Sequence, residues 1–311
     1  MDQFHLFHIF TFLMVVVVGT NGAILPPQVY WKSMLPNTSM PKAITNLLQP
    51  AEYWNKEKAA WMVKLYDEKF VVPPIPLIYI YAASETQLHD KSNAALFFLE
   101  KDLHHGTKLN YQFTNNTSNY EAKFLPREVA NSIPFSSNKL ENILDKFSIK
   151  KGSKEAEILK HTISECEEKS IKGERKLCVT SLESMVDFTT SKLGNNVEVI
   201  ATEVEKESSE LKEYVIEKGV KKLGDKNKTI VCHKENYPYA VFYCHKTDSS
   251  EAYYVPLEDV DGNRVKAIVV CHTDTSNWNP KVLAFQMLKV QPGTVPICHF
   301  VPQDHVVWIS K

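Results

Sequence analysis

Apolar residues recur every three or four positions in three segments between residues 138 and 194, as on the buried face of a helix. The first segment opens with Asn138 and the third with Thr180, and a glutamate three residues later completes a capping-box pattern in each. Ser153 is the predicted cap of the second helix, which is predicted to end at Gly173, and Gly194 ends the third. The predicted core residues are Leu140, Ile143, Leu144 and Phe147, then Ala156, Leu159, Ile163 and Cys166, then Leu182, Met185, Val186 and Leu193.

Beyond Gly194 the period shortens toward two, which is typical of strands with one buried face. The mixed-charge segment from Glu203 to Glu213 is predicted to be a solvated hairpin or loop. Turn residues separate the short apolar runs, so the pattern predicts a one-domain α+β fold, mainly antiparallel β with a few helices at its start. The strand candidates contain Val197, Val199 and Ala201, then Ile230, Val241 to Tyr243, Tyr253 to Val255, and Ile268 to Val270.

Prolines crowd the part of the chain that precedes this domain, among scattered aromatic residues. They predict an extended, loosely structured leader over residues 24–96, with a short helical candidate at Lys56 to Tyr66, and a domain over residues 97–311. The prolines are Pro26, Pro27, Pro36, Pro41, Pro50, Pro73, Pro74 and Pro76.

An apolar block from Leu6 to Val18 has the length of a signal-peptide core and is too short to span a bilayer. Small residues follow, so residues 1–23 are predicted to be a signal peptide cleaved near Ala23. The segment before the block lacks Lys and Arg, and a buried N-terminal helix is the alternative. We expect a secreted mature chain without a membrane span. The net charge of −1 offers no basic excess for nucleic acid.

Because disulfides persist in the secretory pathway, the six cysteines are predicted to form disulfides, and their even number allows all of them to pair. Cys166 and Cys178, at the ends of a predicted loop between two helices, are expected to form a local bridge. Four Asn-x-Ser/Thr sequons are compatible with glycosylation in the same compartment, at Asn37, Asn115, Asn116 and Asn227.

Four cysteines are each followed directly by a histidine, and each pair lies at an end of a predicted strand. Neighbouring strand residues point to opposite faces, so we expect the cysteines to form disulfides and the imidazoles to converge on the other side. The three connectivities of these cysteines remain open. Imidazoles suit Cu, Zn, Ni and Fe, with copper favoured by affinity; histidines that only hydrogen-bond near the bridges are the alternative. The pairs are Cys232-His233, Cys244-His245, Cys271-His272 and Cys298-His299.

The spacing of these pairs, Cys-His-x10-Cys-His-x25-Cys-His-x25-Cys-His after Phe97-Phe98, resembles the BURP-domain family of plants. Further similar segments are Tyr81 to His89, Glu100 to Leu103, Ser181 to Met185, Cys271 to Ser276 and Asp304 to Trp308. The leader, with Tyr30 to Asn37, is similar to the unknown-seed-protein and dehydration-responsive branches.

The resemblance implies a role in seed development or stress response at the cell wall or in the vacuole, with a wall polymer or wall enzyme as partner. It also implies copper ligation by His233, His245, His272 and His299. Some members are copper-dependent peptide cyclases that join a Tyr oxygen or a Trp ring atom to an unactivated carbon of a core peptide, often in their own leader.

This leader lacks the repeated core peptides of clear cyclase precursors. Gln49 to Trp54 and Ile75 to Tyr79 are weakly similar to such peptides, although an ordinary linker accounts for both. An autocatalytic cyclase with its own leader as substrate is therefore the alternative function, with bond formation expected at Trp54, Tyr53 or Tyr79.

Overall fold

The computed structural model describes residues 27–49, 94–113, 122–208, 210–225 and 227–311. The predicted signal peptide, the helical candidate at Lys56 to Tyr66 and the two core-like peptides from Pro50 onward lie outside these ranges. In the part that is described, no helix is long and apolar enough to cross a membrane.

Two antiparallel sheets form the centre of the molecule, as the α+β prediction requires. The smaller sheet has the strand order β3-β9-β8-β13-β4. Its buried positions alternate with exposed ones in the outer strand β4 and are continuous in the central strands β8 and β13, which are covered on both faces. Its strands are β3 (Glu174–Val179), β4 (Val197–Ile200), β8 (Thr229–Lys234), β9 (Phe242–Thr247) and β13 (Val306–Ser310).

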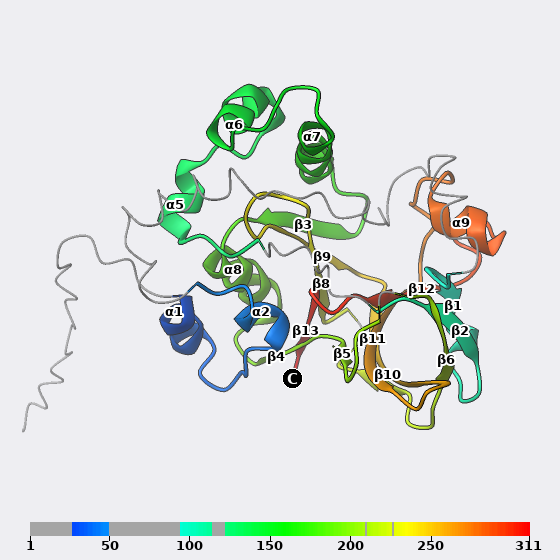
Figure 1. Cartoon of the computed structure of the whole chain (residues 1–311). Helices are drawn as coiled ribbons and strands as arrows, with labels where there is room; N and C mark the ends of the chain where they lie inside the picture. The colour runs from blue at the N-terminus through cyan, green and yellow to red at the C-terminus, as the bar shows by residue number, and fades with distance from the viewer. Residues whose placement is uncertain (1–26, 50–93, 114–121, 209, 226) are drawn as a thin grey trace, which may run out of the picture.

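The larger sheet curls strongly, as Figure 1 shows, and follows the order β1-β12-β11-β10-β6-β2. Two short strands join it off this path, with β5 on β11 and β7 on β10. Its strands are β1 (Phe98–Leu99), β2 (Lys108–Tyr111), β5 (Glu203–Val204), β6 (Lys212–Ile216), β7 (Lys221–Leu223), β10 (Ser250–Asp259), β11 (Arg264–His272) and β12 (Ile297–Val301).

A small apolar core lies between the two sheets, which therefore pack on each other. Strand residues from both sheets build it, among them Val231 of β8, Val270 of β11 and Val307 of β13. The opposite face of each sheet belongs to a separate core. Alternation along the strands thus sends neighbouring side chains into different compartments, and this arrangement positions the site described below.

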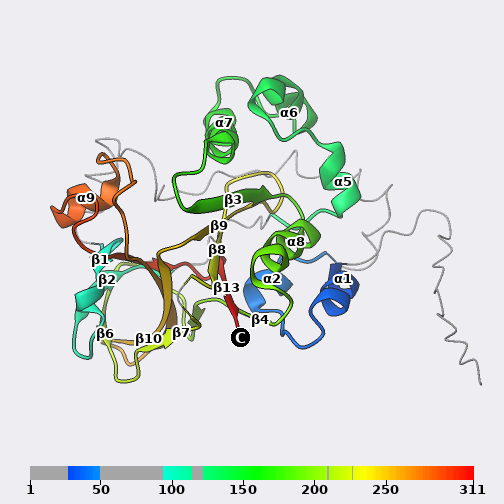
Figure 2. The ribbon, with the colours of Figure 1, turned by 180° about the vertical axis from the view of Figure 1, so that it is seen from behind.

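Helices cover the outer faces (Figures 1 and 2). Helix α8 packs on the smaller sheet, α9 packs against the larger one, and α5, α6 and α7 share a third core with Tyr237 and Tyr239. The α-helices are α1 (Pro27–Met34), α2 (Lys42–Thr45), α5 (Arg127–Ser132), α6 (Leu140–Lys146), α7 (Lys154–Glu167), α8 (Leu182–Leu193) and α9 (Leu283–Leu288), with 3-10 turns at Glu100–Asp102 and Ser137–Lys139.

The predicted caps are partly confirmed. Ser153 accepts a hydrogen bond from the Ala156 amide at the start of α7, and Gly194, with φ of +78°, ends α8. The cap of α8 is Ser181, which exchanges hydrogen bonds with Ser184, so the prediction of Thr180 is wrong by one residue.

Two further boundaries differ from the prediction. Asn138 lies within a 3-10 turn, and α6 begins after Lys139 without a side-chain cap. Helix α7 ends at Glu167 rather than near Gly173, because the chain must turn there to begin β3 at Glu174. The segment at residues 203–213, predicted to be a solvated hairpin or loop, has strands at both ends, β5 and β6, which pair with other strands of the sheet rather than with each other.

Residues 27–49 of the predicted leader contain two short helices, α1 and α2, and pack on the domain, which corrects the prediction of a loosely structured segment there. The indole of Trp31 on α1 packs on that of Trp308 on β13, with ring centroids 5.4 Å apart, and its Nε1 donates to the Thr38 carbonyl. Ile44 and Leu47 are fully buried in the same core. Apolar residues among the prolines therefore dock on the domain, a long-range contact that local patterning does not reveal.

We expect the substitution Trp31→Ala to lower the free energy of unfolding by about 3–5 kcal/mol, because it removes a buried indole and leaves a cavity beside Trp308. Chemical denaturation followed by Trp fluorescence and circular dichroism measures the change. Val29→Ala, on the exposed side of α1, is the matched control and should shift stability by less than about 1 kcal/mol. Equal effects of the two variants would contradict the docking of α1.

Candidate metal centre

Three disulfides pair the six cysteines, as predicted for a chain that folds in an oxidising compartment. Cys166 bonds to Cys178, which confirms the local bridge, although Cys178 lies on β3 rather than in a loop. The connectivity left open by the sequence is resolved as Cys232 with Cys244 and Cys271 with Cys298.

Both of these bridges join residues directly opposite each other on neighbouring antiparallel strands. Cys232 on β8 faces Cys244 on β9, and their sulfurs lie in the core beneath α8. Cys271 on β11 faces Cys298 on β12, and their sulfurs lie in the core of the larger sheet. Each bridge therefore belongs to the outer face of its own sheet.

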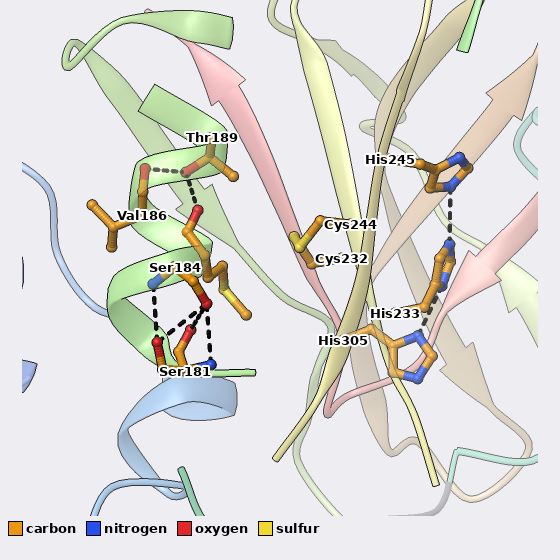
Figure 3. The surroundings of a disulfide bond; sticks show 10 residues. Ser181, Ser184, Val186, Thr189, Cys232, His233, Cys244, His245 and His305 are labelled. Carbon is orange, nitrogen blue, oxygen red and sulfur yellow. Dashed lines mark hydrogen bonds between the residues drawn. A yellow bond between two sulfur atoms is a disulfide. The ribbon is translucent and has the colours of Figure 1, made fainter. Parts of the chain in front are cut away.

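The histidines that follow lie on the inner faces, between the sheets. In each strand pair they are diagonal neighbours: His233 is opposite Tyr243, and His245 is opposite Val231. Figure 3 shows the Cys232–Cys244 bridge on the side of β8 and β9 that faces α8, with His233 and His245 on the other side. His272 and His299 have the same relation on β11 and β12.

The four imidazoles form a closed quadrilateral. Ring-centroid distances around it are 5.3 Å from His233 to His245, 6.0 Å from His245 to His272, 5.6 Å from His272 to His299, and 5.8 Å from His299 to His233. All four side chains are buried. The structure thus brings together all four histidines singled out by the Cys-His motif.

Each of the four rings meets a different partner at Nδ1. His272 Nδ1 lies 3.1 Å from Ser250 Oγ, and His299 Nδ1 lies 3.0 Å from the Phe300 carbonyl. His233 Nδ1 is 3.0 Å from Nδ1 of His305, and His245 Nδ1 is 3.3 Å from Glu174 Oε1. With Nδ1 facing these groups, Nε2 is the nitrogen that each ring keeps for an ion. Outer partners of this kind orient metal-bound histidines in many proteins.

The chemistry of the donors fits a metal ion. His233 Nε2 and His245 Nε2 are 3.3 Å apart. Two nitrogens that bind one tetrahedral ion at about 2.05 Å each lie about 3.3 Å apart as well.

Ligation by all four histidines nevertheless stays a prediction. Among the residues that the structure describes, no group of three or more His, Cys, Asp or Glu side chains is close enough to hold an ion as it stands. Binding by the full set would require the rings to draw closer together.

Burial favours the neutral form of three of the imidazoles, those of His233, His272 and His299, and the neutral form is the one that binds metals. The pKa values of His233 and His272 are well below the usual range, first because burial penalises the cation and then because neighbouring imidazoles repel it. Burial lowers the pKa of His299 to about 4, although the Phe300 carbonyl partly opposes this shift.

Aromatic rings surround the quadrilateral. The Trp278 indole is edge-on to His272 with centroids 4.9 Å apart, and the Tyr243 ring is 5.3 Å from that of His245. Phe97, just before β1, contacts His299 at 6.5 Å. These apolar walls reduce the local dielectric and keep water from the rings.

Sequence reasoning assigned no role to His305, Glu174 or Ser250, the side-chain partners of three imidazoles. His305 lies in the Asp304 to Trp308 segment that resembles the family, which was the available signal.

Of the predicted sequons, Asn37 and Asn227 are exposed, and Asn115 and Asn116 lie outside the described residues. Glycosylation stays a prediction.

The metal-free protein should lose stability as pH falls from about 6.5 to 4. An unfolded histidine takes up its proton near pH 6.5, whereas folded His299 does so only near pH 4, so acid favours the unfolded chain. His299 alone contributes on the order of 3 kcal/mol to this dependence. Denaturation of the chelator-treated protein across this range should show a shallower slope for His299→Gln than for wild type. Parallel slopes would contradict the assignment.

The comparisons with known proteins agree with the motif. The model of the BURP domain matches residues 96–310. The chain is 55% identical over 239 residues to BURP domain protein RD22 of Arabidopsis thaliana, across 76% of this chain and 60% of that protein. It is 54% identical over 237 residues to BURP domain-containing protein 3 of Oryza sativa, across 75% of this chain and 54% of that protein.

A third relative, BURP domain-containing protein 5 of Oryza sativa, is 42% identical over 297 residues, which cover 94% of this chain and 90% of the relative. The chain thus spans little more than half the length of the first two relatives and most of the third. The match to the domain model and the extent of these identities show that the chain belongs to the BURP-domain family of plants.

Proposed function

We propose that this protein binds copper through His233, His245, His272 and His299. The observation that carries the proposal is the closed quadrilateral of buried imidazoles, each of which has Nδ1 turned to a partner. Copper has the highest intrinsic affinity among the divalent first-row ions for nitrogen donors. When bound, it would supply one-electron and dioxygen chemistry that side chains lack.

The proposed setting is the cell wall or the vacuole, in seed development or stress response. Three disulfides fit a secreted protein, and membership of a plant family supports the physiological part of the proposal. A wall polymer or a wall enzyme is the proposed partner. Because two of the relatives are much longer than the aligned region, their whole-protein roles do not transfer directly.

A second candidate function, autocatalytic peptide cyclisation, is favoured by where the chain enters the domain. Phe98 on β1 pairs with Cys298, and the preceding Phe97 contacts the His299 ring. Residues 94–97 therefore lie on the domain with their last residue beside the histidine cluster. In this reaction an aromatic side chain forms a bond to an unactivated carbon, and dioxygen accepts the two hydrogens that leave.

Copper titration of the chelator-treated protein tests the metal site. We expect one tight site in the wild type, and at least a tenfold weaker one in His245→Ala and in His272→Ala, because each loses a nitrogen donor. His104→Ala, which changes an exposed histidine away from the cluster, is the control and should bind as the wild type does. Unchanged affinity in both cluster variants would contradict the shared site.

Mass spectrometry of the copper-loaded protein before and after exposure to oxygen tests the cyclase. A cyclase should lose two hydrogens, about 2 Da, within one peptide that contains Tyr53, Trp54 or Tyr79. Apo-protein in oxygen and His233→Ala with copper are the controls, and neither should change mass. An unchanged mass in the loaded wild type, with added Trp- or Tyr-ending peptides also unmodified, would favour the non-catalytic role.

A further inference from the structure

A fifth histidine, His305, lies against the cluster outside the Cys-His motif. It sits in the turn before β13, with 12% of its side chain exposed, and its ring is edge-on to His233 with centroids 5.1 Å apart. Its Nδ1 is 3.0 Å from Nδ1 of His233 (Figure 3). At this distance one nitrogen must carry the hydrogen and the other must accept it.

The charges on the far side of His305 decide which nitrogen donates. Its Nε2 is 3.7 Å from Asp304 Oδ1, and the other oxygen of Asp304 is 3.5 Å from Lys234 Nζ. The ion pair with Lys234 keeps the Asp304 carboxylate ionised. An ionised carboxylate accepts hydrogen bonds and cannot donate one. The hydrogen of neutral His305 is therefore favoured on Nε2, which leaves Nδ1 as an acceptor.

The same order of hydrogens then extends to His233. Neutral His233 has one hydrogen and two nitrogen neighbours, His305 Nδ1 at 3.0 Å from its Nδ1 and His245 Nε2 at 3.3 Å from its Nε2. Because His305 Nδ1 accepts at the shorter distance, the hydrogen of His233 is favoured on Nδ1, and the lone pair of its Nε2 faces His245. That Nε2 is the atom 3.3 Å from His245 Nε2, at the centre of the cluster. Asp304 and His305 thus determine which nitrogen of His233 is available to an ion, although neither lies in the quadrilateral.

We propose that His305 is a positioning residue, which holds His233 in the tautomer and orientation needed for ligation through Nε2. The inference rests on the proposed metal site and adds to it a residue outside the Cys-His motif. In many metal sites a carboxylate accepts the N–H of a ligating histidine and so orients its ring; here the imidazole of His305 stands between the carboxylate of Asp304 and the ligating His233. His305 is not a direct ligand through Nδ1, since that lone pair accepts the hydrogen of His233.

Two substitutions separate positioning from simple space filling. His305→Asn can place an amide oxygen near the position of Nδ1 and keep the acceptor, whereas His305→Leu fills the space without one. We expect competition titrations with Cu²⁺ and Zn²⁺ to show 10–100-fold weaker binding in His305→Leu, and binding close to wild type in His305→Asn. Equal loss in both variants, or no loss in either, would overturn the proposal. Circular dichroism of the metal-free variants checks that both fold.

Nitrogen NMR of ¹⁵N-histidine-labelled wild type tests the order of hydrogens directly and requires no variant. In the metal-free protein near pH 8 we expect His305 to be protonated on Nε2 and His233 on Nδ1. In the zinc-loaded protein His233 should keep its Nδ1 hydrogen while its Nε2 shifts. A hydrogen on Nδ1 of His305 would refute the positioning role even if the metal binds. Absence of any metal binding by the wild type would instead refute the proposed function, and the metal-free spectrum would still test the order of hydrogens.

Discussion

The cross-strand disulfides are the constraint on which the rest of the site depends. Strand side chains alternate between faces, so a one-residue slip of β8 against β9 would turn His233 toward the core beneath α8 and a cysteine toward the cluster. The bond between Cys232 and Cys244 forbids that slip, and the bond between Cys271 and Cys298 forbids it in β11 and β12. Register, and with it the direction of every imidazole, is therefore fixed covalently.

Three apolar cores surround the bridges and the histidines. The two bridges lie in separate outer cores, and the histidines border the small core between the sheets. Imidazoles packed so closely would repel one another if charged, and burial lowers the pKa values of His233, His272 and His299. Neutral rings still need partners for their hydrogens, which Ser250, the Phe300 carbonyl and His305 provide from outside the quadrilateral.

The local parts of this design could be predicted from the sequence. Adjacent Cys and His on a strand imply opposite faces, and the stripes through Leu140, Leu159 and Leu182 correctly marked three helices. The cysteine pairing could not be derived, because it depends on which strands are neighbours. The side-chain partners of Nδ1 are also contacts between distant segments, such as Glu174 with His245. The packing of Trp31 on Trp308 joins nearly opposite ends of the chain, where periodicity carries no information.

Because of that packing, residues 27–49 belong to the folded unit rather than to a separate leader. Hydrogen bonds add to the apolar contacts: Thr38 donates to the Val197 carbonyl, and the Phe124 amide donates to the Leu47 carbonyl. A version of the chain that starts at residue 96 would lack part of its own interior and expose the Trp308 surface. Conversely, a proteolytic cut between residues 50 and 93 would divide the polypeptide without releasing its N-terminal piece. Such a product would be a non-covalent two-chain complex that migrates as one species until it is denatured.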